Sequence, residues 1–152
     1  MTGIFHKARK AYMKKYKKGM LFGSWDCLHY GHIRIISEAQ RYCESLIVIV
    51  DSDELIYSTK KRDPIVPLQY RLLDLLQIKG VCLGGIDVEA TEGETFVGSS
   101  KKHLTERYKP DVLIKGDDWK GKGWDGENLG VPVLYLPYTK GISSTMFHEA
   151  KI

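Results

Sequence analysis

Short apolar runs recur along this chain of 152 residues, and segments with helical periodicity lie between them. Runs of this length are typical of strands that are buried on both faces of a parallel sheet. Parallel strands need crossover connections, which are usually helices. The alternation therefore predicts an α/β fold. The predicted strands are at 19–22, 46–50, 81–88, 112–114 and 131–136.

Three of the intervening segments have the pattern of amphipathic helices. The segment 33–43 carries apolar residues at helical spacing, and 68–78 carries a leucine-rich stripe directly after Pro67, a favourable helix opener. A third helix is predicted over 99–108, with one of its first two serines as the N-cap. Right-handed β-α-β units then form an open, doubly wound sheet with helices on both faces, and ligands bind beyond the carboxyl ends of its strands.

The N-terminal segment 1–17 is expected to be a basic extension of a single domain that spans 18–152. The first 18 residues carry seven of the 23 Lys and Arg residues and no acid, and the remainder has 16 basic and 19 acidic residues. The extension is interpreted as a solvated arm, with binding to nucleic acid or an anionic surface as the alternative. The balanced remainder excludes a general polyanion binder, so a nucleic-acid partner is not expected.

Composition also indicates where the protein works. The longest apolar run is far too short to span a membrane, and the N-terminus lacks the apolar region of a signal peptide. The three cysteines show no paired spacing. These features favour reduced thiols and a cytoplasmic location.

The stretch "GSWDCLHYGH" at 23–32 joins the first predicted strand to the first predicted helix. Unpaired N–H groups and the helix dipole attract an anion at such a helix start, and Gly31 lets a phosphate approach the backbone. His29 and His32 can each donate a hydrogen bond to that phosphate. A zinc site would need further ligands, and no CxxC accompanies the pair, so no metal-binding residues are predicted. Two ordinary histidines remain the other alternative.

Sequence motifs exclude two common nucleotide-binding loops and indicate a third kind. The chain contains neither GxxxxGK[ST] nor GxGxxG. Instead, "GSWDCLHYGH" resembles the G-x-[FW]-D-x-x-H-x-G-H signature of the cytidylyltransferase-like nucleotidyltransferases. "PLQYR" (67–71), "KPDVLIKGDDWKGK" (109–122) and "YLPYTKGISST" (135–145) are similar to later stretches of the same family, in the same order. The resemblance covers 18–152, is strongest to glycerol-3-phosphate cytidylyltransferases, and implies a Rossmann-like sheet.

The resemblance also implies roles for individual residues. His29, His32 and Lys61 are implied to be catalytic. Asp26 orders the loop or lies near the metal and phosphates, Gly116 and Asp118 lie beside the base, and 143–145 cap the last helix and donate to phosphates. The implied nucleotide-binding residues are Ser24, Trp25, Asp26, Gly31, Lys60, Arg62, Arg71, Gly116, Asp118, Ser143, Ser144 and Thr145.

Simpler interpretations exist for several of these residues. The segment 60–62 can be a solvated loop, Arg71 a helix-surface charge, and the hydroxyls at 143–145 plain helix caps. Trp119 fits either the core or a pocket wall. The sequence also departs from the family pattern, because Tyr138 and Lys79 stand where arginines are expected. Phe96 is the nearest candidate for the aromatic residue that packs on the base.

The implied activity is transfer of CMP from CTP to a small phosphorylated alcohol, with release of pyrophosphate. The acceptor phosphate attacks directly in line, Mg²⁺ bridges the triphosphate, and the enzyme is a homodimer. The alternatives are an adenylyltransferase for a heptose-like sugar phosphate, which "DPIVPLQYR" also resembles, and a nucleotide-binding module without turnover. A fragment of a class I aminoacyl-tRNA synthetase is disfavoured, because no KMSKS stretch follows.

Overall fold

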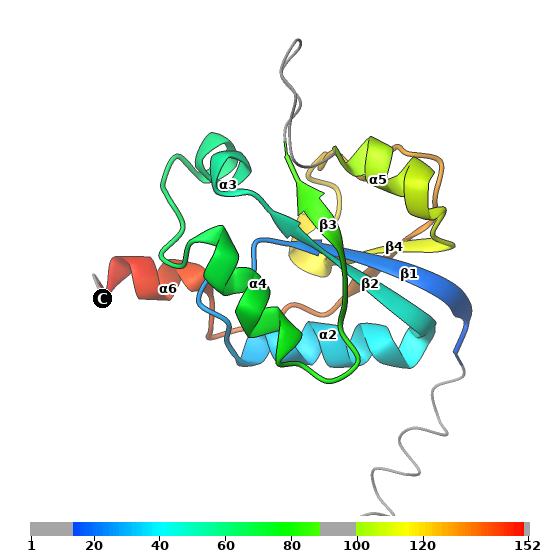
Figure 1. The fold of residues 1–152 in the computed structure, drawn as a ribbon, viewed down its shortest axis with the longest axis horizontal. Helices are drawn as coiled ribbons and strands as arrows, with labels where there is room; N and C mark the ends of the chain where they lie inside the picture. The colour runs from blue at the N-terminus through cyan, green and yellow to red at the C-terminus, as the bar shows by residue number, and fades with distance from the viewer. Residues whose placement is uncertain (1–13, 89–99, 151–152) are drawn as a thin grey trace, which may run out of the picture.

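The computed structural model describes residues 14–88 and 100–150. Its centre is a five-stranded parallel sheet with strand order β3-β2-β1-β4-β5, as Figure 1 shows. The strands are β1 (Tyr16–Gly23), β2 (Cys43–Asp51), β3 (Cys82–Asp87), β4 (Val112–Gly116) and β5 (Val133–Leu136). The chain builds outward from β1 to β3 and then returns to the other side of β1, so the strand order reverses between β1 and β4. Ligands bind at such a reversal in open α/β sheets.

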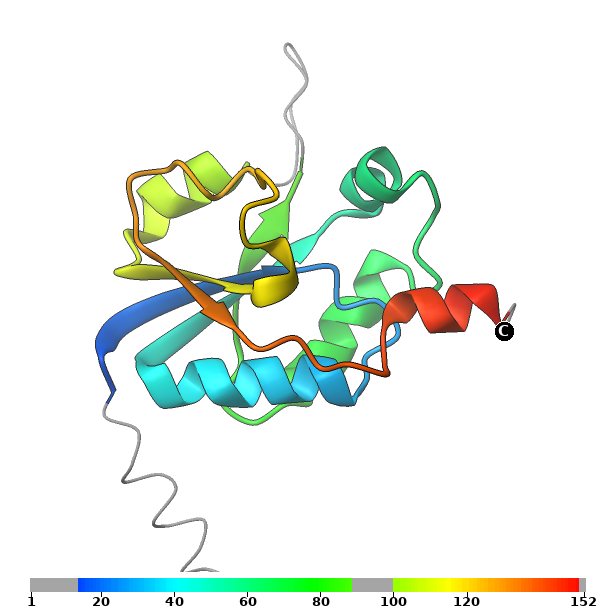
Figure 2. The same ribbon diagram turned by 180° about the vertical axis from the view of Figure 1, so that it is seen from behind.

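Helices cover both faces of this sheet. The helices are α2 (Tyr30–Tyr42), α3 (Asp53–Lys60), α4 (Leu68–Leu76), α5 (Lys101–Tyr108) and α6 (Ser144–Glu149), with a short 3-10 turn η1 (Asp117–Trp119). Figures 1 and 2 show α2 and α4 together on one face and α5 on the other. The predicted Rossmann-like α/β fold with an open parallel sheet is therefore confirmed.

Two core layers follow from the alternation of side chains along the strands. Leu21 of β1 packs in one layer with Ile36 of α2 and Leu75 of α4. Its neighbours Met20 and Phe22 point to the other layer, which contains Leu104 of α5 and Trp124. Strand residues two apart share a face of the sheet, so one strand supplies both layers. All of these side chains are almost fully buried.

The predicted strands and helices form with small shifts at their ends. The helix α2 begins at Tyr30, three residues before the predicted start, so His32 lies inside its first turn. The helix α5 has Ser100 as its N-cap, whose side chain accepts a hydrogen bond from the His103 N–H. The strand β1 begins at Tyr16 and thus reaches two residues into the range expected to be the extension. Residues 1–13, and Phe96 in the segment 89–99, lie outside the described residues.

The helix α3 and the turn η1 were not predicted. Only Leu55 and Ile56 are buried in α3, so its sequence carries no apolar stripe. Start signals were nevertheless present: Ser52 caps the helix by accepting from the Leu55 N–H at 3.0 Å, and two acidic residues follow it. No helix among the described residues is long and apolar enough to cross a membrane.

Candidate active site

The carboxyl edge of the sheet gathers most of the residues that the sequence singled out. The loop after β1 meets the end of β2 through a hydrogen bond from Ser24 Oγ to Asp51 Oδ2, at 3.1 Å. It meets the start of α6 where Ser144 Oγ donates to the Asp26 carbonyl at 2.5 Å. In Figures 1 and 2 the first turns of α2 and α6 lie beside this loop. Two helix N-termini and two strand ends therefore face one region.

His29 and His32 are fixed by backbone hydrogen bonds at the start of α2. His29 is the N-cap, and its Nδ1 accepts from the Gly31 N–H at 3.1 Å. The His32 Nδ1 accepts in turn from the His29 N–H at 3.2 Å, which completes a reciprocal capping box. A nitrogen that accepts carries no hydrogen, so the hydrogen of each neutral ring is on Nε2. Both rings therefore offer an Nε2–H donor.

Both imidazoles are held in the neutral form. Burial lowers the pKa of His29. Burial, together with the neighbouring His29 and Lys60, lowers the pKa of His32 to about 3. The rings of Trp25 and His32 also pack in a T-shaped contact, with centroids 5.4 Å apart. These surroundings make both groups neutral hydrogen-bond donors near pH 7.

Gly31 occupies a position that has no room for a side chain. A Cβ atom there would lie 2.9 Å from Cε1 of His29. A larger residue would therefore push the His29 ring away from the helix start. Gly31 is expected to let a phosphate approach the backbone, and its contact with His29 is a second reason for a glycine at this position.

Trp25 and Asp26 support the loop from inside. Trp25 has a positive φ of 57°, and its indole Nε1–H donates to the Ile49 carbonyl at 2.9 Å. The Asp26 carboxylate accepts from the N–H groups of Ile65 and Val66 at 3.0 and 2.9 Å. Both side chains are nearly inaccessible to solvent. In this structure they shape the loop and present no free polar atom to a ligand.

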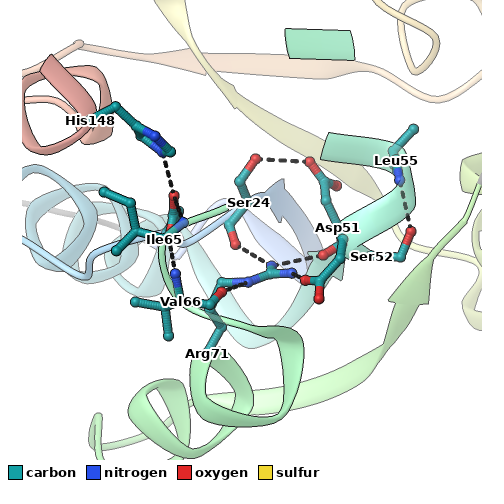
Figure 3. Close-up of polar contacts among 10 residues, drawn as sticks. Ser24, Asp51, Ser52, Leu55, Ile65, Val66, Arg71 and His148 are labelled. Carbon is teal, nitrogen blue, oxygen red and sulfur yellow. Dashed lines mark hydrogen bonds and ion pairs between the residues drawn. The ribbon is translucent and has the colours of Figure 1, made fainter. Parts of the chain in front are cut away.

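The Asp26 carboxylate also ties α6 to the site. His148 of α6 lies 3.0 Å from Asp26 Oδ2 through its Nε2 (Figure 3). Burial alone raises the pKa of Asp26, but the N–H groups of Val66 and Ile65 and the contact with His148 lower it below its usual value. Asp26 therefore acts as a buried anchor for two segments that are distant in the sequence.

Arg71 is fully buried, so its interpretation as a helix-surface charge is wrong. Its guanidinium donates to the carbonyls of Ser24, Asp51 and Val66 at 2.6, 2.7 and 2.9 Å. It also pairs with Asp53 at 2.5 Å (Figure 3). Arg71 therefore joins the ends of β1 and β2 to the first turn of α3, and it has no exposed surface for a ligand.

The basic segment 60–62 begins inside a helix, so the expectation of a loop over all three residues is wrong. Lys60 is the last residue of α3, and Lys61 is its C-cap with a left-handed φ of 57°. Both lysines are exposed. The Arg62 guanidinium donates to Thr145 Oγ1 at 3.0 Å, so this segment reaches the start of α6.

The hydroxyls at the start of α6 bond to other segments and do not cap the helix. Ser143 stands at the N-cap position, yet its side chain makes no capping hydrogen bond. Ser144 and Thr145 instead bond to the Asp26 carbonyl and to Arg62. The plain capping interpretation is therefore wrong for the side chain of Ser143. The hydroxyls join α6 to the loop after β1 and to the basic segment.

The stretch after β4 forms the opposite side of the region. Gly116 ends β4, and the exposed Asp118 lies in η1 with its Oδ1 2.5 Å from the place a Cβ of Gly116 would occupy. Trp119 is 39% exposed, which fits a wall of a site better than a core position. Asp117 Oδ1 accepts from the Tyr138 N–H at 2.9 Å and so joins η1 to the segment after β5.

A charged cluster at the same edge was not found from the sequence. Lys101 pairs with Asp87 in the interior and with Asp125 at 3.2 Å. Burial alone lowers the pKa of Lys101, but the carboxylates of Asp51, Asp87 and Asp125 raise it above its usual value. Burial raises the pKa of Asp87 to about 6, although the ammonium of Lys101 acts to lower it. No spacing rule links these residues, because they lie on separate elements that the fold brings together.

Lys115 completes this charged cluster. Its ammonium lies over the rings of Trp119 and Trp124, 5.0 and 5.4 Å from their centroids. Burial lowers the pKa of Lys115, while Asp51 acts to raise it. Within 14–88 and 100–150, no hydrogen bond or ion pair holds this ammonium. It is therefore available to a ligand at the end of β4.

Metal ligation by protein side chains finds little support in this region. The described part of the chain contains no group of three or more His, Cys, Asp or Glu residues that could hold a metal ion. The Nδ1 atoms of both histidines already accept backbone hydrogen bonds. The zinc alternative therefore lacks a ligand set among these residues.

Comparisons with known proteins identify the family of this chain. A family model described as "Cytidylyltransferase-like" matches residues 20–150. The glycerol-3-phosphate cytidylyltransferase of Bacillus subtilis is 32% identical over 88% of this chain and 95% of its own length. The enzyme of the same name from Staphylococcus aureus is 31% identical over 88% of this chain and 93% of its own length. The bifunctional protein HldE of Nitratiruptor is 33% identical over 84% of this chain, which corresponds to 26% of HldE.

A solved structure shows the same fold. The lipopolysaccharide core biosynthesis protein of Thermoplasma volcanium superposes with a TM-score of 0.60 and 24% identity, over 84% of this chain and 99% of its own. The family model covers most of the chain, including both histidines, Arg71 and the start of α6. The protein therefore belongs to the cytidylyltransferase-like family and is a nucleotidyltransferase enzyme.

Proposed function

We propose that this enzyme transfers CMP from CTP to a small phosphorylated alcohol and releases pyrophosphate. The observation that carries this proposal is the pair of Nε2–H donors that the His29–His32 capping box fixes at the start of α2. Support also comes from the two glycerol-3-phosphate cytidylyltransferases, which match over nearly their whole length.

The acceptor phosphate attacks the α-phosphate of the nucleotide directly and in line. It is already anionic, so no covalent intermediate with the enzyme is needed. The two neutral imidazoles donate to the oxygens on which negative charge grows, and they do so without reorganisation because their Nδ1 atoms are fixed. The exposed ammonium groups of Lys60 and Lys61 stabilise the pyrophosphate leaving group.

Three of the predicted nucleotide-binding residues serve the reaction indirectly. The buried side chains of Trp25, Asp26 and Arg71 hold the loop after β1 and the end of β2 in place. Residues with accessible polar groups make the direct contacts to the nucleotide. Gly116 and Asp118, after β4, supply the acceptor for the amino group of cytosine, and Ser143 to Thr145 line the phosphates at the start of α6.

Mg²⁺ is expected to enter with the triphosphate, where it neutralises charge on the phosphate oxygens. The ion prefers substrate phosphates and water to a dedicated protein cage. We expect at most one carboxylate of the chain to contact it.

Transfer of AMP to a sugar phosphate is the second candidate. The observation that favours it is the stretch "DPIVPLQYR" (63–71), which also resembles adenylyltransferases that act on a heptose-like sugar phosphate. Pyrophosphate release with CTP, ATP, GTP and UTP, each against a panel of acceptor phosphates, distinguishes the two. CTP is expected to bind more tightly and turn over faster than ATP, and the reverse result would establish the adenylyl alternative.

We also propose that the enzyme is a homodimer in the cytoplasm. Tyr30 and Ile33 at the start of α2 are large apolar residues that are 67% and 40% exposed. A partner that covers them would also enclose the nearby histidines. All three cysteines are free, as a reducing compartment requires. Analytical ultracentrifugation of the wild type and of Ile33→Glu tests the dimer, because a charge at its centre is expected to give monomers.

A further inference from the structure

The carboxylate of Asp51 has an unsatisfied oxygen at the centre of the site. Asp51 is the last residue of β2, and its Oδ2 accepts from Ser24 Oγ at 3.1 Å (Figure 3). Its Oδ1 is buried and accepts no hydrogen bond from any residue in 14–88 or 100–150. A buried acceptor without a donor costs roughly 1–3 kcal/mol. Such a group is expected to find its donor when the site fills.

Asp51 ends β2, and its charge acts on lysines of three other elements. Its charge acts on Lys60, which also acts on His32 and hence belongs to the phosphate region. It also acts on Lys101 and Lys115, at the ends of α5 and β4. Its own main-chain carbonyl is fixed by Arg71. The backbone at this point is therefore rigid, and only the carboxylate is free to respond to a ligand.

We propose that Asp51 selects the acceptor by taking a hydrogen bond from a hydroxyl group on the carbon skeleton of a phosphorylated polyol. This inference rests on the proposed function, because it names the kind of acceptor that the same site takes. The torsion that turns a carboxylate is broad and roughly two-fold. A small turn thus brings the free oxygen toward the ligand without loss of the bond from Ser24.

The surrounding charges favour a hydroxyl over an ammonium as the donor. A hydroxyl both donates and accepts, so it can donate to Asp51 while it accepts from a lysine. An ammonium only donates, and three lysine ammonium groups already interact with the Asp51 carboxylate. A phosphorylated amino alcohol would place its positive charge near Lys60 and Lys115, which form no ion pair among the described residues, whereas Lys101 is already paired with Asp87 and Asp125. Like charges placed together in this way disfavour the wrong ligand.

The test compares acceptors that offer Asp51 a hydroxyl, no donor, or an ammonium. Initial rates of pyrophosphate release are measured with glycerol 3-phosphate, with propyl phosphate, which lacks the hydroxyls, and with phosphoethanolamine. The proteins are the wild type, Asp51→Ala, Asp51→Asn, and Asp74→Asn as a matched control at an exposed carboxylate of α4. CTP affinity is measured separately, by calorimetry without acceptor.

The wild type is expected to prefer glycerol 3-phosphate over both other acceptors. In Asp51→Ala, kcat/KM for glycerol 3-phosphate is expected to fall about 10- to 100-fold, as for one hydrogen bond to a charged group. The rate with propyl phosphate and the affinity for CTP should change little, and so should every value in Asp74→Asn. Asp51→Asn keeps the side-chain shape but replaces the free acceptor with an NH₂ donor, so it should also lose part of the preference even if Asp51→Ala folds poorly.

Other results overturn the inference in distinguishable ways. Unchanged acceptor preference in both Asp51 variants, or a wild-type preference for phosphoethanolamine, rejects the inference and leaves the nucleotidyltransferase proposal intact. Weaker CTP binding, or a higher Mg²⁺ requirement, would assign Asp51 to the nucleotide or the ion instead. A wild type that binds CTP but releases no pyrophosphate with any phosphorylated acceptor rejects the proposed function, and the inference with it.

Discussion

The imidazole rings of His29 and His32 stack with centroids 3.7 Å apart and an angle of 19° between their planes. Each ring uses Nδ1 to accept a backbone N–H at the start of α2. This pairing fixes the direction of both rings and the position of both hydrogens. A phosphate in front of α2 therefore meets two prepared donors in addition to the helix dipole.

Removal of either donor is expected to slow the reaction without unfolding the enzyme. His29→Ala and His32→Ala should each lower kcat about 10²- to 10³-fold, the typical loss for one hydrogen bond that stabilises transition-state charge. His29→Ala should also cost about 1 kcal/mol of folding stability, because it removes an N-cap. Steady-state kinetics and urea unfolding measure the two effects. His103→Ala, at an exposed histidine of α5, is the control, and near wild-type turnover in both variants would contradict the mechanism.

The depressed pKa of His32 predicts a pH dependence of stability. The pKa rises to about 6.5 when the chain unfolds, so the unfolded state binds more protons between that value and the folded pKa of about 3. The contribution of His32 to the free energy of unfolding should therefore be fully present above about pH 6.5. It should be lost progressively as the pH falls toward 3. Urea unfolding between pH 7 and pH 4 measures the slope. His32→Gln should reduce it, and an equal slope in wild type and variant would show that His32 is not its source.

Arg71 is expected to be a determinant of stability. Its removal would leave three carbonyls and the partly exposed Asp53 carboxylate without their donor, and each buried acceptor left unsatisfied costs roughly 1–3 kcal/mol. Arg71→Ala should thus lower the unfolding free energy far more than Arg107→Ala, at an exposed arginine of α5. Arg71→Lys keeps the charge without the planar fork and should fall between them. Similar urea midpoints for Arg71→Ala and Arg107→Ala would refute this role.

The basic segment is expected to act on the nucleotide. Lys61→Ala should lower kcat by about one to two orders of magnitude with no loss of stability, because its exposed ammonium has only the phosphates to stabilise. Lys102→Ala, at an exposed lysine of α5, should leave kcat unchanged. Hydrogen exchange at 60–62 should slow when CTP and Mg²⁺ are added. A segment that exchanges equally fast with and without nucleotide would remove these residues from the site.

Much of the framework could be predicted from local patterns. All five strands and the helices α2, α4 and α5 were found from apolar runs and helical spacing, with errors of a few residues at their ends. The turn at 23–32 was placed at the first strand–helix junction, where both histidines now lie. Helix α3 was missed because it buries only two side chains, too few to produce a periodic signal.

Roles that depend on burial could not be predicted in the same way. The family motif implies nucleotide binding for Trp25, Asp26 and Arg71, with loop ordering as the other role of Asp26. The structure adds that all three side chains are buried and hydrogen-bonded within the protein. The same types of residue in the same motif can touch a ligand or support the loop that does. Only the depth of each side chain distinguishes these roles, and depth is a property of the packed molecule.

The sequence by itself determined the α/β architecture, the helix start with its two histidines, and the family. These features follow from spacings of a few residues, which fix local backbone geometry. The tertiary structure alone placed Asp51 against Ser24 and brought its charge to act on Lys101 and Lys115, although these three residues lie 27, 50 and 64 positions from Asp51 in the chain. Their meeting depends on the strand order and on the register in which parallel strands end at one edge of the sheet. Long-range pairing of this kind is set by the free energy of the whole core and leaves no short-range pattern in the sequence.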